Sequence, residues 1–367
     1  MKLRVAILFG GKSAEHEVSL QSAKNIVAAL DRDRFDPVLI GIDKEGAWRL
    51  GPAGRFLLNG DDPKRIALNK STKTLSVVPG SSTNPIVAAG SLQILGKIDV
   101  VFPVLHGPYG EDGSMQGLLK MVDLPFVGPG VLGSAVGMDK DVMKRLLRDA
   151  GIPVADFLAC GRHQREALSF EAAAKVLGAP MFVKPANLGS SIGISKVASP
   201  EQFGAALEEA FKYDRKIVIE SNVIGREIEC AVLGNENPQA SVPGEVIANA
   251  AAHGFYSYAA KYIDGKGAEL RIPADLPPGK AAEIQTMAVR TFQVLCCEGM
   301  ARVDLFLKSD GSLVVNEINT IPGFTFVSMY PKLWEASGIG FTELISRLID
   351  LARSRHAAEK ALKTTVE

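Results

Sequence analysis

Residues 300–323, MARVDLFLKSDGSLVVNEINTIPG, constrain the fold of this chain most strongly. Segments 300–308 and 312–318 alternate apolar and polar residues as strands do, and Asp310-Gly311 between them is typical of a two-residue hairpin turn. That turn places Asp304 opposite Glu317 and Arg302 opposite Asn319. All four side chains then share one face, because side chains on a strand alternate with a period of two.

Two carboxylates directly opposite each other destabilise a sheet, and a cation between them reverses the sign of that interaction. Asp, Glu and Asn oxygens are the hard ligands that Mg²⁺ takes, with phosphate oxygens completing its shell. The hairpin therefore predicts half of a magnesium–nucleotide site. The alternative is an ordinary hairpin with a solvated acidic face. Two features favour the site, namely a turn-forming loop at 319–323 and an opposite face expected to cover a core, with Val303, Leu305, Leu307, Val314 and Ile318.

Composition limits the classes of protein that fit. The chain has 367 residues, enough for two or three domains, and 41 basic residues balance 41 acidic ones. This balance does not indicate a nucleic-acid surface. Residues 1–9 are too short an apolar run for a signal peptide, and no stretch has the length of a membrane span. The four cysteines lack CxxC spacing, which favours reduced thiols in a cytoplasmic protein.

The N-terminal segment is typical of a doubly wound α/β fold. A buried strand over 3–9, a helix over 19–30 and a second strand over 37–42 form the opening β-α-β unit. A further buried strand over 99–105 ends in a Gly-rich, charged loop over 106–113. Ligands bind at the carboxyl ends of strands in such sheets. Residues 51–97 are weakly periodic, and we expect an irregular or short-stranded insertion there.

The later part of the chain is typical of an α+β fold. Short strands are expected over 181–184, 192–197, 216–220, 226–233 and 242–247, and helices are expected over 140–150, 200–211, 280–296 and 341–363. Segment 248–271 is polar and aromatic. Because long loops inside compact domains are often lids, we expect segment 253–262 to close on a ligand.

Lys184 ends one of these strands and precedes a Gly/Ser loop over 189–193. Such a loop can cover phosphates with backbone N–H groups, while the lysine neutralises their charge. Taken alone, the loop fits a hairpin turn as well. Glu220 and Glu227 lie near the ends of two strands, where they could bind adenosine or serve only as surface acids.

These motifs together resemble a known family. Glu15-His16-Glu17 after Gly10-Gly11, the loop His106–Gly113, Lys184-Pro185 with Gly189-Ser190-Ser191, Lys261-Tyr262, Arg302-Val-Asp304 and the segment Asn316–Gly323 look like the D-alanine–D-alanine ligases of the ATP-grasp superfamily. The match spans nearly the whole chain in order. The resemblance implies an N-terminal doubly wound (pre-ATP-grasp) domain over 1–130, followed by a two-subdomain ATP-grasp fold over 131–222 and 223–367.

The resemblance also implies a reaction. The carboxylate of a first D-alanine attacks the γ-phosphate of ATP to give an acyl phosphate and ADP. The amine of a second D-alanine then attacks the carbonyl through a tetrahedral intermediate that expels phosphate, for peptidoglycan precursor synthesis. ATP is the co-substrate, two Mg²⁺ ions are expected per site with Mn²⁺ as a substitute, and a cytoplasmic homodimer is expected.

Residue roles follow from the same resemblance. Metal ligands would be Asp304, Glu317 and Asn319. ATP would contact Lys140, Lys184, Glu220, Ser221, Val223, Glu227, Lys261 and Asn316. Arg302 and Gly323 would form the oxyanion hole. Glu15 would hold the first ammonium and, with Ser190 and Tyr262, close the lid. His106 would lie near the first D-alanine, while Ser328 and Met329 would contact the second.

Other functions remain as alternatives. A related ligase could use D-lactate or D-serine as the acceptor, although Tyr262 favours dipeptide synthesis by resemblance. A nicotinamide oxidoreductase would fit the β-α-β start, but residues 10–15 lack Gly-x-Gly-x-x-Gly. A non-catalytic nucleotide-binding module would be expected to lack the acidic pair.

Overall fold

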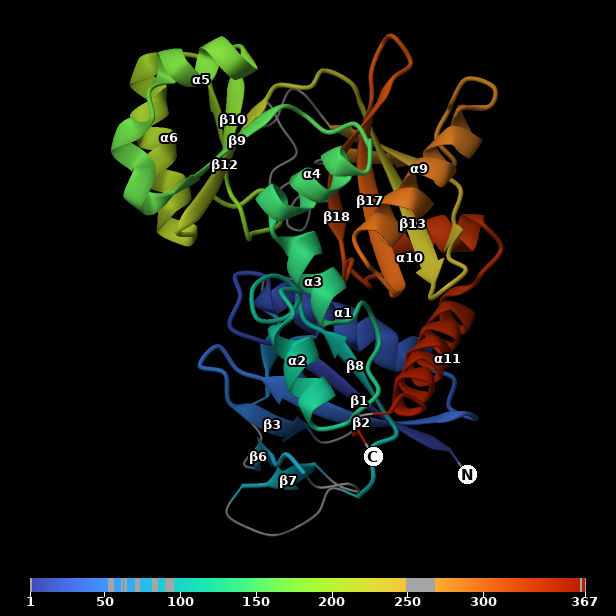
Figure 1. Cartoon of the computed structure of the whole chain (residues 1–367). Helices are drawn as coiled ribbons and strands as arrows, with labels where there is room; N and C mark the ends of the chain where they lie inside the picture. The colour runs from blue at the N-terminus through green and yellow to red at the C-terminus, as the bar shows by residue number, and fades with distance from the viewer. Residues whose placement is uncertain are drawn as a thin grey trace.

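The computed structural model has three parts (Figure 1). It describes residues 2–51, 56–60, 62, 65–69, 73–80, 85–89, 96–248, 268–363 and 365–366. An N-terminal part lies at the bottom of the view, a small central part at the upper left, and a C-terminal part at the upper right. Within the described residues, no helix is long and apolar enough to cross a membrane.

The N-terminal part is built on a six-stranded sheet of order β7-β6-β3-β2-β1-β8. Its parallel centre consists of β1 (Leu3–Gly10), β2 (Phe35–Ile42) and β8 (Val100–Val104). Gly10 ends β1 with φ +93°, and a Cβ there would lie 2.2 Å from the Ile42 carbonyl oxygen, so only glycine fits. This turn leads into α1 (His16–Ala29), which starts three residues earlier than expected.

The insertion over 51–97 contains short strands, as expected. Its described elements form the antiparallel edge of the sheet and a separate two-stranded hairpin. The strands preceding and within it are β3 (Trp48–Gly51), β4 (Leu57–Leu58), β5 (Ala67–Leu68), β6 (Thr74–Val77) and β7 (Ile86–Ala88).

Three helices connect the N-terminal part to the rest: α2 (Ser114–Met121), α3 (Val131–Met138) and α4 (Lys140–Asp149). The Asp139 side chain caps α4 by accepting hydrogen bonds from the amides of Asp141 and Val142. Met143 and Leu147 are buried on one side of α4, which spans the helix expected over 140–150. Helices α2 and α3 were not among the expected elements, and both short segments contain glycine.

The central part is an antiparallel sheet of order β11-β10-β12-β9 covered by two helices. Its elements are β9 (Phe157–Gly161), the 3₁₀ helix η1 (Arg162–Ala167), α5 (Phe170–Leu177), β10 (Met181–Pro185), β11 (Ser195–Val197), α6 (Pro200–Tyr213) and β12 (Lys216–Ser221). The α+β expectation is therefore confirmed here.

The C-terminal part holds a sheet of order β16-β15-β13-β17-β18, with β14 paired to β13. Its strands are β13 (Arg226–Gly234), β14 (Gln239–Ala240), β15 (Gly244–Ala248), β16 (Ala268–Arg271), β17 (Gly299–Leu307) and β18 (Leu313–Asn319). Its helices are α9 (Lys280–Val294), α10 (Met329–Ala336) and α11 (Phe341–Lys360).

The β17–β18 hairpin has the expected register at the site but not the expected turn. Asp304 pairs with Glu317 and Arg302 with Asn319, whereas Leu305 pairs with Val315. The Lys308 amide donates to the Ser312 carbonyl, so three residues close the turn, with Gly311 at φ +83°. The prediction of a two-residue turn was therefore wrong, and a β-bulge restores the register beside Asp304.

The same bulge changes which residues of β18 face the core. Leu313 and Val315 are buried, Val314 is only half-buried, and Ile318 is buried again. The expectation that Val314 lies in the core was therefore wrong. One extra residue, Asn316, shifts the phase of the strand, so that Glu317 and Asn319 both face away from the core.

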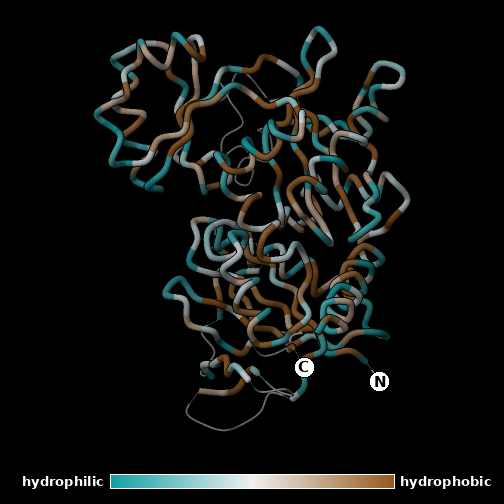
Figure 2. Tube along the Cα trace, viewed as in Figure 1, coloured by the Kyte–Doolittle hydropathy of each residue, from teal (hydrophilic) through white to brown (hydrophobic). Residues whose placement is uncertain are grey.

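Apolar side chains fill continuous cores beneath these sheets. In Figure 2 the hydrophobic colour follows the strands inside each part, and hydrophilic residues lie mainly on the outer turns. One core joins β1, α1 and β8 of the N-terminal part to β13, α10 and α11 of the C-terminal part. The four cysteines are unpaired thiols, and three of them are buried.

Candidate functional site

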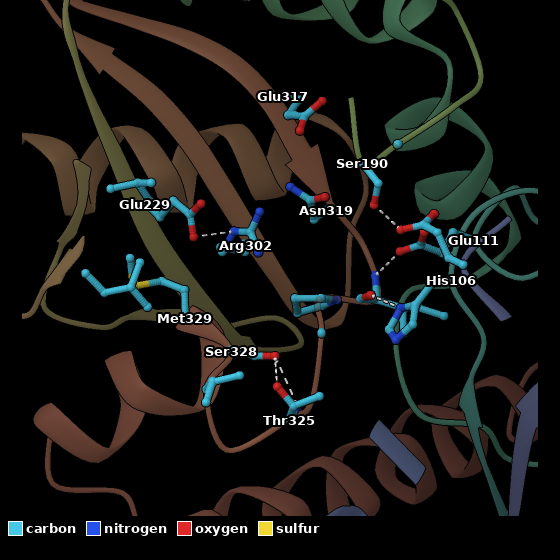
Figure 3. Close-up of a pocket in the computed structure, with 18 residues that line it drawn as sticks. His106, Glu111, Ser190, Glu229, Arg302, Glu317, Asn319, Thr325, Ser328 and Met329 are labelled. Atoms are coloured by element: carbon cyan, nitrogen blue, oxygen red, sulfur yellow. Dashed lines mark hydrogen bonds and ion pairs between the residues drawn. The ribbon is translucent and has the colours of Figure 1, made fainter. Parts of the chain in front are cut away.

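A pocket lies where the three parts of the molecule meet (Figure 3). Its walls come from the loop after β1, the loop after β8, the Gly/Ser loop after β10, strands β13, β17 and β18, and the segment that leads into α10. Among the predicted site residues that line it are Glu15, His106, Ser190, Arg302, Glu317, Asn319, Gly323, Ser328 and Met329.

Three carboxylates form a row across three neighbouring strands on the pocket face. Glu229 of β13 pairs with Asp304 of β17, which in turn pairs with Glu317 of β18. Glu229 is 4% exposed and Asp304 is 2% exposed. Because like charges directly opposite one another are unfavourable, this row needs cations.

Arg302 supplies one of those cations. Its Nε lies 2.7 Å from Asp304 Oδ1 and 2.8 Å from Glu229 Oε2, and its second guanidinium nitrogen lies 2.7 Å from Asp304 Oδ2. Asn319 Nδ2 donates to the same Asp304 oxygen at 2.9 Å. Figure 3 shows Glu229 and Arg302 side by side on the strands, with Asn319 and Glu317 beyond them.

Three lysines form a second group of positive charges near Glu317 and Glu220. Lys140 Nζ lies 3.6 Å from Glu317 Oε2 and donates to the Leu188 carbonyl at 2.7 Å. Lys184 donates to Glu220 at 2.7 Å, and the fully buried Lys144 lies 3.4 Å from the same carboxylate. Sequence reasoning missed Lys144, although it lies one helical turn after Lys140.

Burial alone would raise the pKa of Glu220, but Lys144 and Lys184 outweigh it and hold that pKa at about 2. Burial lowers the pKa of Lys144, and the charge of Glu220 opposes that shift. This part of the site therefore holds a buried anion between two lysines, with Lys140 nearby.

His106, in the loop after β8, is buried against the loop that follows β18. Its Nδ1 donates to the Ile321 carbonyl at 3.0 Å, so its Nε2 accepts from Ser22 Oγ at 3.2 Å. Ser22 Oγ also accepts from the Phe324 amide. Burial lowers the pKa of His106 to about 4, so the imidazole is neutral at physiological pH.

Glu111 joins the same two loops and was missed by sequence reasoning as a site residue. It accepts hydrogen bonds from the Gly107 amide at 2.7 Å and the Ile321 amide at 3.0 Å. Burial, and next the charge of Glu15, raise its pKa to about 8. The Gly-rich loop supplied the only sequence signal, because Ile321 is 210 residues away in the chain.

The Gly/Ser loop reaches across to the N-terminal part. Ser190 Oγ donates a hydrogen bond to Glu15, so the two side chains are in contact. A Cβ at Gly107 would lie 2.8 Å from the Glu15 carboxylate. Ser190 and Ser191 have φ values of +54° and +58°, a left-handed conformation that is strained for residues other than glycine.

The segment after β18 forms the opposite wall of the pocket. Ser328 Oγ accepts from the Thr325 amide at 3.1 Å and lies 2.7 Å from the Thr325 hydroxyl (Figure 3). A Cβ at Gly323 would lie 2.9 Å from Ser328 Oγ, so the backbone passes close to this hydroxyl. Met329 starts α10 directly after it.

The other predicted residues have different placements. Ser221 ends β12, Val223 follows it, and Glu227 lies on β13 opposite Phe306. Asn316 is the extra residue of the bulge. Lys261 and Tyr262, with the expected lid over 253–262, lie outside the described residues.

Comparison with known proteins decides the family. The model of the "D-ala D-ala ligase N-terminus" matches residues 4–129, and that of the "D-ala D-ala ligase C-terminus" matches residues 146–350. The chain belongs to the D-alanine–D-alanine ligase family. The ATP-grasp resemblance predicted from the motifs is therefore confirmed.

Relatives of this family match the chain over nearly its whole length. D-alanine–D-alanine ligase A of Escherichia coli K12 is 56% identical over 365 residues, which cover 100% of both proteins. The structure of the D-alanine–D-alanine ligase from Coxiella burnetii superposes with a TM-score of 0.83 at 39% identity, covering 98% of this chain and 96% of that one. The VanG D-Ala:D-Ser ligase from Enterococcus faecalis also gives 0.83, at 35% identity, covering 96% of this chain and 100% of that one.

Proposed function

We propose that this protein joins two D-alanine molecules, using ATP, to form D-alanyl-D-alanine for peptidoglycan precursors. The observation that supports this most directly is a pocket, in a member of the D-alanine–D-alanine ligase family, that is lined by acidic side chains, Arg302 and the Gly/Ser loop, with Lys140 lying 3.6 Å from Glu317. A carboxylate is a poor acyl donor because it would have to expel oxide. Phosphorylation by ATP supplies a leaving group.

The first D-alanine has a site between the N-terminal loops. Glu15 would pair with its ammonium group, and Ser190 would keep that carboxylate oriented through their hydrogen bond. His106, neutral and fixed by two hydrogen bonds, would border this subsite without adding charge. Tyr262 would complete the link to Ser190 when the chain closes over the substrate.

The triphosphate would lie along the lysines and the Gly/Ser loop. Lys140, Lys184 and Lys261 would contact the phosphates, with Asn316 from the bulge. Main-chain groups of Glu220, Ser221 and Val223, together with Glu227, would bind the adenosine where β12 leaves the central sheet. Lysine ammonium groups act here as point charges that offset the phosphate charge.

Asp304, Glu317 and Asn319 would hold two Mg²⁺ ions, for which Mn²⁺ could substitute. Two adjacent carboxylates and an amide oxygen are the donor set that Mg²⁺ prefers when phosphates complete its shell. Among the described residues, no group of three or more His, Cys, Asp or Glu side chains is arranged to hold a metal ion. The metal would offset the charge that develops on the transferred phosphoryl group.

Arg302 and the Gly323 amide would stabilise the oxyanion of the tetrahedral intermediate. Both border the pocket, and preorganised donors of this kind contribute strongly to acyl transfer. Ser328 and Met329 would contact the second D-alanine. We also propose that the protein acts in the cytoplasm as a homodimer.

A related ligase with D-lactate or D-serine as acceptor is the second candidate, since the VanG structure is named a D-Ala:D-Ser ligase. Phosphate release from ATP and Mg²⁺ should rise strongly with D-alanine and not with L-alanine. Product analysis with equal D-alanine, D-serine and D-lactate should then give mainly D-alanyl-D-alanine. No stimulation by D-alanine would refute the proposed function, and a mixed product would favour the second candidate.

Tyr262→Phe should raise the share of D-lactate product.

A further inference from the structure

Glu229 is a buried acid of the pocket to which the proposed reaction gives no role. It lies on β13 directly opposite Asp304, on the side of Asp304 away from Glu317. Its carboxylate is 4% exposed, so its charge must be compensated within the protein. This carboxylate lies 2.8 Å from Arg302 Nε, an ionic contact within the same sheet.

Arg302 is shared between two acids with different tasks. It binds both oxygens of Asp304, and Asn319 donates to one of those oxygens as well. Both oxygens of Asp304 therefore accept hydrogen bonds from protein groups in this structure. A metal that binds Asp304 therefore has to displace part of this contact.

We propose that Glu229 is a positioning residue that holds Arg302 when Asp304 binds the metal. The inference rests on the proposed metal site. A guanidinium group has five N–H donors in a rigid fork, so Arg302 can release Asp304 and keep Glu229. Glu229 thus keeps a short ionic contact with the guanidinium group and limits the competition of the arginine with the metal for Asp304.

This role differs from simple charge compensation in what it predicts. If Glu229 only balances a buried charge, its loss lowers stability and affects metal binding only through the small change in local charge. If it holds Arg302 away from Asp304, its loss weakens metal binding through Arg302. Arg302 is therefore the intermediary that a double-mutant comparison can detect.

The test is Mn²⁺ binding to the full chain in the presence of ADP, measured by the paramagnetic signal of free Mn²⁺. Glu229→Gln should weaken Mn²⁺ affinity by about tenfold or more, the usual effect of removing a group that orients a metal ligand. Glu245→Gln is the matched control, because Glu245 is 6% exposed and pairs with Arg226 through two contacts of 2.7 Å in the same sheet. We expect the control to bind Mn²⁺ within about twofold of the original protein.

The decisive comparison repeats the substitution in an Arg302→Met protein. There, Glu229→Gln should change Mn²⁺ affinity by less than about twofold, because the intermediary is gone. An equal loss with and without Arg302, or no loss in either, would overturn the proposal. If Glu229→Gln does not fold, Glu229→Asp replaces it, since a shorter acid keeps the charge but holds Arg302 less well.

Steady-state kinetics provide a second readout. Glu229→Gln should lower kcat and raise the Mg²⁺ concentration needed for half-maximal rate, and the KM for D-alanine at the first site should change little. Because Mn²⁺ binding does not depend on the identity of the amino acid, a protein that ignored D-alanine would refute the proposed function without deciding this inference.

Discussion

At the scale of single residues, His106 shows how burial changes the chemistry of a side chain. Its pKa falls from an ordinary 6.5 to about 4, so between these values the unfolded chain binds a proton that the folded protein does not. The stability that neutral His106 provides is therefore present above pH 6.5 and is lost as pH falls towards 4. At pH 5 this loss amounts to about 2 kcal/mol.

We expect His106→Gln to remove this part of the pH dependence. Between pH 7.5 and pH 5, denaturant unfolding of the original protein should show about 2 kcal/mol more loss of stability than the variant. The exposed His163 provides the control, since His163→Gln should keep the full pH dependence. Equal slopes for the original protein and His106→Gln would contradict the buried, neutral state of His106.

A substitution at Glu317 should distinguish an effect on catalysis from an effect on folding. The Glu317 side chain is 22% exposed, so a neutral glutamine there should cost the fold little. If Glu317 holds a metal, Glu317→Gln should lower Mg²⁺-dependent phosphate release by about 100-fold, equivalent to about 3 kcal/mol. Thermal unfolding should shift by no more than it does in Glu283→Gln, an exposed salt-bridge control. A parallel loss of rate and stability would argue against a metal-binding role.

Some site residues could be predicted from the sequence and others could not. Arg302, Asp304, Glu317 and Asn319 follow from the alternation of two adjacent strands. Glu229 could have been identified from the sequence, because it shares a strand face with Glu227 by the period of two. Glu111 could not have been assigned from the sequence, because its role depends on the Ile321 amide, which only the folded chain brings close.

At the scale of elements, the β17–β18 hairpin shows the limit of turn signals. Asp310-Gly311 predicted a two-residue turn, but three residues close it, and the bulge at Asn316 corrects the register. The Asp304–Glu317 pairing was thus correct although the expected turn was wrong. Bulges have no simple sequence signature, and the apolar run Leu313-Val314-Val315 does not show which of these residues face the core.

Deletion of Asn316 should test what the bulge contributes. Without Asn316, β18 alternates regularly with Val315 and Ile318 still facing the core, so the protein should fold. The polar face loses one residue and the added local twist, and the metal-binding pair shifts relative to the lysines. We expect unfolding within about 1–2 kcal/mol of the original protein but a rate at least about 100-fold lower. A deletion variant with a normal rate would show that the bulge is dispensable.

At the scale of the whole molecule, the two ends of the chain form one core. Helix α11 packs against α1 and β8 of the N-terminal part as well as β13 and β17 of the C-terminal part. The sequence predicted the helix, but not its partners, because amphipathic periodicity shows that a face is buried and not what buries it. The division of the chain at 130 and 222 stays a prediction of the resemblance. Met143 and Leu147, placed by that division in the central part, pack in the C-terminal core.

Arg355 connects these ends through a buried guanidinium group. It donates to the carbonyls of Gly128 at 2.6 Å and Phe126 at 2.8 Å, and it lies 4.5 Å from the centroid of the Phe126 ring. Arg355→Met would fill much of the same volume but leave both buried carbonyl groups without this donor. Each such loss costs about 1–3 kcal/mol, so we expect a total destabilisation of about 3 kcal/mol.

The rate of the reaction should respond differently, because Arg355 does not line the pocket. At 20 °C, well below unfolding, Arg355→Met should keep D-alanine-dependent phosphate release within about twofold, while urea unfolding shifts by the full amount. Arg353→Met on the exposed side of α11 is the control and should change unfolding by less than about 0.5 kcal/mol. Equal stability of the two variants would mean that α11 is held by its apolar face alone. A large loss of rate at unchanged stability would instead mean that Arg355 sets the position of the Gly128 loop relative to the site.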